Sequence, residues 1–383
     1  ELGSQGHTFW ALLDNAVSLD DPGNFSAHMP LAWALRMLVH AILGDDVSYA
    51  WRLHAAIGAI LGALATWWCV ARRGRPGAAL AAGLIVAVNP VLSYHAHDST
   101  NYALGPLTGA LTVAGLCDLA DGRRSAALWL GLGLLLGCAN DYFFGFVLIA
   151  AAVLTPLLLG RSPHRGVSRA AAMKAWIAVA VGLAVPVGVL AVRALGVPFS
   201  GVIGPHADPF VTSPGLLHFF LFEPARLVVA YQEGYGAFQE TAFWVFAGPV
   251  MLAAACAVWG IRRREPRAVA AAALAVVTVG LFMIVAATFT AAFDRLFPTY
   301  VRAFTALLPA MAIVVTLALL SRGPRIGAAL LGAVLFFQGA ATVIQLGSLS
   351  DTQSWAAERV AAHWRAGDVL ATGLDLRFRL RGD

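Results

Sequence analysis

The chain has 383 residues, of which 59% are hydrophobic and only 12% are charged. A soluble domain is roughly 45–50% apolar, so this composition excludes an ordinary soluble enzyme. The net charge of +5 does not indicate nucleic-acid binding, because the arginines stand in short segments between apolar runs rather than in one basic stripe.

Repeated apolar runs, most of them about 17–25 residues long, have the length that a helix needs to cross a bilayer. They do not alternate polar and apolar residues as the strands of a membrane barrel do. The sequence therefore predicts an all-α polytopic membrane protein with about ten transmembrane helices. The predicted spans are Trp51–Ala71, Ala78–Tyr94, Ala103–Leu119, Ala126–Ala139, Tyr142–Leu159, Ala171–Leu195, Ala242–Gly260, Ala268–Ala291, Ala303–Leu320 and Ile326–Leu346.

Three parts follow from this arrangement. Residues 1–50 form a first extracytoplasmic loop, within which the apolar stretch 31–44 is too short to span and predicts an amphipathic helix lying at the membrane interface. Residues 51–346 form the transmembrane domain, with a long outer loop over 197–241 that is rich in aromatic residues, proline and glycine. Residues 347–383 form an extracytoplasmic tail, which we expect to be part of a truncated outer domain.

Basic residues mark alternate connections between the predicted spans. Five such connections fall on one side of the membrane, and by the positive-inside rule that side is the cytoplasm. We therefore expect a multi-pass protein of the bacterial inner membrane whose other loops lie outside the cytoplasm. The basic residues are Arg72, Arg73, Arg75, Arg123, Arg124, Arg161, Arg165, Arg169, Lys174, Arg262, Arg263, Arg264, Arg267, Arg322 and Arg325.

The outer side includes the stretch Asn89–Leu104, NPVLSYHAHDSTNYAL, which is unusually polar for this chain. Its acidic residue, Asp98, is suited to be a catalytic base or to cap the helix that begins near Tyr102. Imidazole and carboxylate groups are also metal ligands, so His95 and His97 beside Asp98 leave a divalent metal site open as an alternative. The four cysteines lie inside apolar runs and are interpreted as buried hydrophobic residues.

Four stretches resemble a known family of membrane enzymes. They are HMPLAWALRMLVHAILGDDVSYAWRLHAAIGAILGAL, NPVLSYHAHDSTNYAL, NDYFFGFVLIAAAV and PTYVRAFTALLPAMAIV. Together they resemble membrane glycosyltransferases of the GT-C fold, specifically the dolichyl-phosphate-mannose protein mannosyltransferase and ArnT-like group. The sequence departs from that pattern in two ways: we expect the family's first transmembrane helix to be missing before Glu1, and Thr100 stands where the family often has arginine.

The resemblance implies an enzyme that moves a sugar from a polyprenyl-phosphate donor to a lipid, glycan or protein acceptor on the extracytoplasmic face. An outer-loop carboxylate would take the proton of the acceptor, and cationic side chains would hold the leaving phosphate. The candidate catalytic residues are Glu1, Asp98 and Asp14. The candidate substrate-binding residues are His28, Arg52, His95, His97, Tyr102, Tyr300 and Arg302.

Several of these residues also have purely structural interpretations. Arg52 and Arg302 stand at the outer ends of predicted spans, where arginine commonly extends toward lipid headgroups. Tyr102 and Tyr300 suit the aromatic belt at a membrane surface. For the whole protein, the alternative functions are a transporter or lipid-linked-sugar flippase and a scaffold without chemistry. A transporter would be expected to show internal repeats and ionisable groups at mid-membrane, and the sequence shows no repeat.

Overall fold

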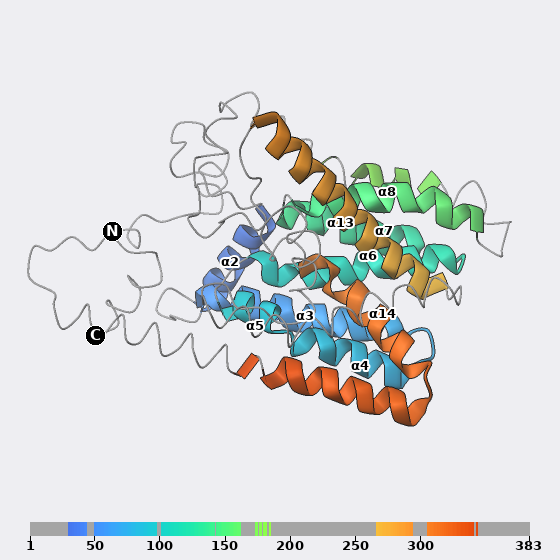
Figure 1. Cartoon of the computed structure of the whole chain (residues 1–383). Coiled ribbons are helices and arrows are strands. Elements are labelled where there is room, and N and C mark those ends of the chain that lie inside the picture. The colour runs from blue at the N-terminus through green and yellow to red at the C-terminus, as the bar shows by residue number, and fades with distance from the viewer. Residues whose placement is uncertain are drawn as a thin grey trace, which may run out of the picture.

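The computed structural model describes residues 30–43, 50–97, 101–141, 143–161, 266–293, 305–340 and 342–343, together with parts of 173–184. All regular structure in these ranges is helical, as the sequence predicts. The helices run side by side in a bundle, with α2 lying obliquely across one end (Figure 1). They are α2 (Pro30–Leu43), α3 (Ala50–Ala71), α4 (Pro76–Ala87), α5 (Pro90–His97), the 3-10 helix η1 (Asn101–Leu104), α6 (Gly105–Ala120), α7 (Ala126–Asn140), α8 (Phe144–Arg161), α13 (Pro266–Phe293), α14 (Leu308–Leu320) and a last helix, Pro324–Ala340.

Two of these helical stretches, Leu53–Ala71 and Asn101–Ala120, are long and apolar enough to cross a membrane, and six shorter apolar helices accompany them. The count of about ten transmembrane helices therefore stays a prediction. The predicted span Ala242–Gly260, the outer loop 197–241 and the tail 347–383 lie outside the described residues.

The prediction of one continuous span over Ala78–Tyr94 was wrong, because the chain breaks between α4 and α5. Pro90 has no N–H to donate and disfavours helical backbone at the residue before it. Asn89 starts the new helix, since its side-chain oxygen accepts the Leu92 N–H at 3.2 Å. The carbonyl of Val88 accepts instead from the hydroxyl of Thr342, two residues beyond the last helix, at 2.8 Å, so this hydroxyl satisfies a group that the break leaves open.

Helix α6 is the centre of the bundle (Figure 1). Every residue from Gly105 to Ala120 is buried except Leu107 and Leu111. It packs against α3, α7, α8, α13 and α14. Small residues allow this close approach, because a Cβ at Gly109 would overlap the backbone carbonyl of Ala306.

Replacing Gly109 by alanine is expected to destabilise the protein by about 1–3 kcal/mol, because the added methyl group has to push the backbone at Ala306 away from α6. Gly280 in α13 is the matched control, since a Cβ there meets nothing within 4 Å. Gly280→Ala should leave stability unchanged or raise it by up to about 1 kcal/mol. Reversible unfolding in mixed detergent micelles measures both variants, and equal effects would contradict the packing seen at Gly109.

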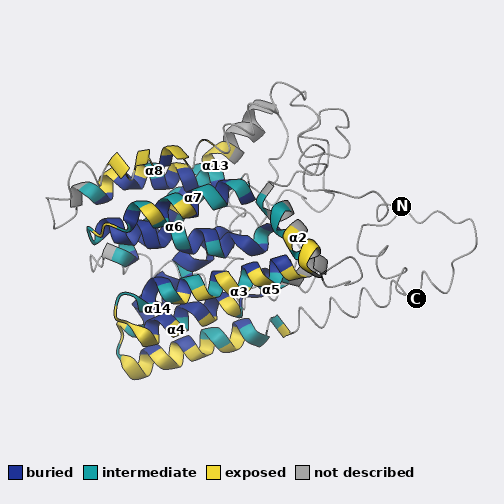
Figure 2. Ribbon diagram, turned by 180° about the vertical axis from the view of Figure 1, so that it is seen from behind, coloured by how far each residue is buried: buried dark blue, intermediate teal, exposed yellow. Residues whose placement is uncertain are grey.

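The outer faces of the bundle carry large exposed hydrophobic side chains. Figure 2 shows the exposed positions on α4, α8 and the last helix. Large exposed side chains on these faces include Leu80, Val153 and Phe336, which are 57%, 48% and 70% exposed. A monomeric soluble protein rarely exposes so much contiguous apolar surface. The surface therefore fits contact with lipid.

The two ends of the bundle differ in their charge. The basic connections 72–75, 121–125 and 321–323 lie at one end, together with the first turn of α13, whereas α2, α5 and η1 lie at the other (Figure 1). The predicted helix over residues 31–44 is present as α2, and it packs on α3 and α7. The end of α5 and the start of η1 are therefore separated from the arginine-rich connections by the length of the bundle.

Candidate functional site

The end of α5 and the start of η1 bring two predicted site residues together. The His95 ring lies 5.3 Å from the Tyr102 ring, measured between centroids, with 54° between their planes. His95 is only 4% exposed. Both α5 and η1 pack against α3, so the ring pair is formed by two elements that lie against that helix.

Asn101 joins this connection to the end of α7. Its side-chain amide donates to the backbone carbonyl of Asn140 at 2.9 Å, and the Asn140 side-chain amide donates to the carbonyl of Asn101 at 2.9 Å. Both residues are buried, at 5% and 1% exposure. The carbonyl of Asn140 belongs to the last turn of a helix, where backbone acceptors lack partners within the helix. The start of η1 and the end of α7 are thus held together, and the sequence assigns both to the extracytoplasmic side of the membrane.

The two asparagines are expected to act as a unit. Asn101→Ala and Asn140→Ala should each destabilise the protein by about 1–2 kcal/mol, because each removes a donor and leaves a buried carbonyl without it. A double-mutant cycle should show a coupling energy of about 0.5–2 kcal/mol. Unfolding measurements on the two single variants and the double variant give that energy, and strictly additive effects would argue against the reciprocal pair.

Most of the predicted site lies beyond the described residues. Six of the ten residues are in this group: Glu1, Asp14, His28, Asp98, Tyr300 and Arg302. Arg52 lies in the first turn of α3 and His97 is the last residue of α5, and their side chains are not described. Among the described residues no three His, Cys, Asp or Glu side chains cluster as a metal site requires.

Three polar residues near this end were not selected from the sequence. Asn140 ends the apolar run of α7, His54 lies in the second turn of α3 at 2% exposure, and Thr305 is buried just before α14. An ionisable group inside an apolar run is a recognised signal of function in membrane proteins, so His54 carried a usable signal. Asn140 and Thr305 gave no signal of function in the sequence, because single amides and hydroxyls are common at helix ends.

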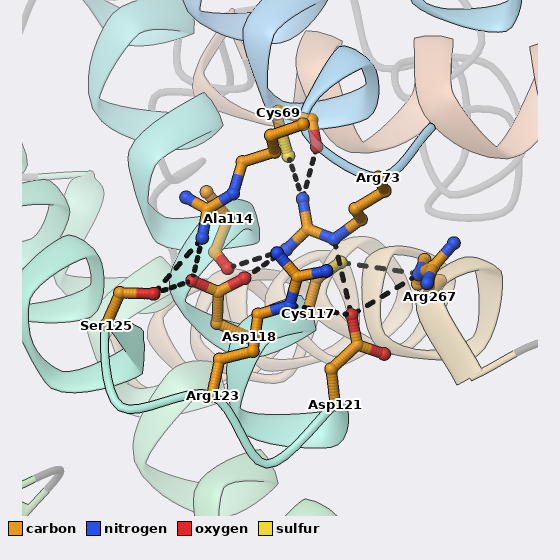
Figure 3. A network of polar contacts seen from close by, with 10 residues as sticks. Cys69, Arg73, Ala114, Cys117, Asp118, Asp121, Arg123, Ser125 and Arg267 are labelled. Carbon is orange, nitrogen blue, oxygen red and sulfur yellow. Dashed lines mark hydrogen bonds and ion pairs between the residues drawn. The ribbon is translucent and has the colours of Figure 1, made fainter. Parts of the chain in front are cut away.

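A second polar cluster lies at the opposite, basic end of the bundle (Figure 3). Asp118 in the last turn of α6 is fully buried. One carboxylate oxygen accepts from Arg72 and from the Ser125 hydroxyl, the latter at 2.6 Å, and the other accepts from Arg73 at 2.6 Å. A carboxylate is unfavourable at a helix C-terminus unless cations compensate it, and the two arginines supply that compensation.

Asp121 continues this cluster toward α13. Its Oδ2 lies 3.5 Å from Arg73 Nε, 3.4 Å from Arg267 Nε and 3.8 Å from Arg123 Nε. Arg73 also donates to the backbone carbonyls of Cys69 and, at 3.1 Å, Ala114. These contacts fasten the connection after α3 to the connection after α6 and to the start of α13.

Arg72 is also held by aromatic rings. Its guanidinium carbon lies 4.6 Å from the centre of the Trp68 ring and 5.8 Å from that of Trp129, and the two indoles meet edge to face at 4.7 Å. Cation–π attraction adds to the ion pair with Asp118. Together these contacts make a rigid structural clamp, and nothing in it resembles a site for catalysis.

The charge state of Arg73 is fixed by its neighbours. Burial lowers the pKa of the Arg73 guanidinium, but the negative charges beside it, which include the carboxylates of Asp118 and Asp121, outweigh that effect and raise the pKa above its ordinary value. The guanidinium therefore keeps its positive charge at any physiological pH.

Comparison with known proteins gives a match at the level of the fold. No protein-family model matches the chain, and no curated protein matches it in sequence. Among solved structures, the crystal structure of ArnT from Cupriavidus metallidurans in the apo state matches with a TM-score of 0.52 and 17% identity over 92% of this chain. The chain spans 57% of the ArnT chain. The helical bundle described above therefore has the fold of ArnT, a member of the group that the sequence motifs resemble.

Proposed function

We propose that the chain is an integral-membrane glycosyltransferase that moves a sugar from a polyprenyl-phosphate-linked donor to an acceptor on the extracytoplasmic face. The observation that carries the proposal is the fold match to ArnT over 92% of the chain. It is supported by the presence of His95, Tyr102, Asn101 and Asn140 together at the end of the bundle opposite to the arginine-rich connections.

The basic connections support the proposed orientation. Connections 72–75, 121–125 and 321–323 share the end of the bundle opposite to α5 and η1 (Figure 1). Arginine-rich short loops are typical of the cytoplasmic side. The end that carries His95 and Tyr102 would then face the outside of the cytoplasm, where the phosphate of a polyprenyl donor meets the membrane surface.

The proposed chemistry needs a carboxylate base and cations. Asp98 is the leading candidate for the base, because in the sequence it directly follows His97, the last residue of α5, and α5 lies at the proposed outer end. Its carboxylate would take the proton of the acceptor hydroxyl as the acceptor attacks the anomeric carbon, and the bond from that carbon to the phosphate oxygen would break. Arg52, at the start of α3, is a candidate to hold the departing phosphate. Glu1 and Asp14 are alternative bases.

A transfer assay tests this proposal. The protein in lipid nanodiscs is incubated with a panel of polyprenyl-phosphate sugars that carry a radiolabel in the sugar, together with lipid, glycan and peptide acceptors. We expect free polyprenyl phosphate and labelled acceptor to form in equal amounts. Movement of the intact labelled lipid across a liposome membrane, without cleavage of the sugar–phosphate bond, would instead show a flippase and overturn the proposal.

A further inference from the structure

The break between α4 and α5 determines the direction of the helix that leads into the candidate functional site. Helix α5 is eight residues long, and its first three residues, Pro90–Leu92, are buried. His95 follows Leu92 by three residues, a spacing that places the two on the same side of a helix. The direction in which α5 leaves the break therefore decides where the His95 ring lies relative to the Tyr102 ring.

Asn89 links the two helices at the break, and its side chain is fully buried. Its backbone N–H donates to the Val86 carbonyl of α4 at 3.2 Å. Its side-chain oxygen accepts the Leu92 N–H at 3.2 Å, and its backbone carbonyl accepts the Ser93 N–H at 2.9 Å. The bond to Val86 belongs to the end of α4 and the other two belong to the start of α5. One residue thus fixes both helix ends.

A distant segment of the chain holds the residue before Asn89. In a continuous helix the Val88 carbonyl would accept the Leu92 N–H, but that N–H donates to Asn89. The Val88 carbonyl accepts the Thr342 hydroxyl at 2.8 Å, from 254 residues further along the chain. Thr342 follows the last helix, which lies beside α4 in both Figure 1 and Figure 2. The point from which α5 departs is therefore fastened to a second part of the bundle.

We propose that Asn89 and Thr342 are positioning residues for the proposed sugar transfer. They hold the break in the geometry at which α5 brings His95 to Tyr102, and neither has to touch a substrate. The inference rests on the proposed function, because it assigns catalytic value to the end of α5. A displacement of about 1 Å in a site can lower the rate about a hundredfold, so a loosened break lowers transfer even when the fold is kept.

Thr342→Val tests the proposal, because valine keeps the branched shape of threonine but has no hydroxyl to donate to Val88. The first measurement does not depend on activity. It is the NMR spectrum of the histidine imidazoles in detergent micelles, with the His95 resonances assigned by means of His95→Gln. The Tyr102 ring lies 5.3 Å from His95, so its ring current reports their relative placement. We expect Thr342→Val to shift these resonances and Thr342→Ser, which keeps the hydroxyl, to leave them unchanged.

The second measurement is sugar transfer in the assay given above. We expect kcat of Thr342→Val to fall about tenfold and KM for the donor to change less than about twofold, because alignment is lost while the substrate contacts remain. Thr342→Ser should restore kcat. Asn89→Ala should act as Thr342→Val does, and Asn89→Ser, which keeps a capping oxygen, should act less.

Thr155→Val is the matched control. Thr155 is also buried, and its hydroxyl donates to the Ala151 carbonyl at 2.7 Å within α8. The control therefore removes the same group without touching the break, and both measurements should stay at the wild-type values.

Three outcomes would overturn the proposal: His95 resonances that do not move in Thr342→Val, an equal change in Thr155→Val, or shifted resonances with an unchanged kcat. If Asn89→Ala unfolds, the comparison of Thr342→Val with Thr342→Ser decides. A wild-type protein that transfers no sugar from any donor would refute the proposed function, and the role in transfer with it. The NMR comparison would still show whether the break holds His95 against Tyr102.

Discussion

Asp118→Asn is expected to destabilise the protein by about 3–5 kcal/mol, the usual cost of leaving a buried charge without its partner. The substitution preserves the shape of the side chain but removes the negative charge that faces Arg72 and Arg73. Arg73 is 3% exposed and cannot recover hydration without moving the connection between α3 and α4. Equilibrium unfolding in mixed detergent micelles, or the thermal transition in nanodiscs, measures the loss.

Asp121→Asn provides the matched control for this experiment. Asp121 belongs to the same cluster, but its side chain is 16% exposed and its oxygen lies 3.4–3.8 Å from the arginines. Partly exposed pairs at such distances contribute about 1 kcal/mol or less. If the two variants lost the same stability, the two-pronged contact of Asp118 with Arg72 and Arg73 would not be what fastens these helices together.

Asp98→Asn is expected to lower the rate of sugar transfer by about 10²–10⁴-fold, the usual contribution of a positioned general base. Asparagine cannot take the proton of the acceptor. It does remain an effective helix N-cap, as good as aspartate. A purely structural role as a cap for η1 and α6 therefore predicts nearly full activity, whereas a catalytic role predicts its loss. The transfer assay and a melting curve on the same sample distinguish the two.

Ser99→Ala is the control for Asp98→Asn, because it removes a polar group from the adjacent position and leaves the carboxylate in place. We expect it to retain most of the activity. Full transfer by Asp98→Asn would remove Asp98 from the mechanism and make Glu1 and Asp14 the next carboxylates to test. It would leave the fold match to ArnT unaffected.

Much of the helical framework could be predicted from the sequence because helix formation in an apolar run is local. The prediction Trp51–Ala71 corresponds to α3 at Ala50–Ala71, and Ala126–Ala139 corresponds to α7 at Ala126–Asn140. Gly74 and Gly122 follow two of the helices with φ angles of 78° and 70°, a backbone conformation that favours glycine and ends a helix. The break between α4 and α5 also had a local signal, since Pro90 stands inside the predicted span, but the hydropathy of the run hid it.

The candidate site was only partly accessible from the sequence. The polar stretch around Asp98 drew attention to His95 and Tyr102, and the structure places their rings 5.3 Å apart. Asn140 was missed because its partner, Asn101, lies 39 residues away along the chain. Nothing in the local pattern of either segment specifies that they meet.

For the residues that the structure describes, the sequence by itself determined most of the helical segments and showed that the connections 72–75, 121–125 and 321–323 contain arginines. The tertiary structure decided which side chains meet. Asp118 reaches Arg73 across 45 residues, and Asn101 reaches Asn140, only because α6 packs closely against α3 and α7. That packing depends on small residues such as Gly109, whose neighbours come from a segment almost 200 residues later in the chain. Contacts of this kind depend on the direction in which helices cross, and hydropathy along the chain contains no information about that direction.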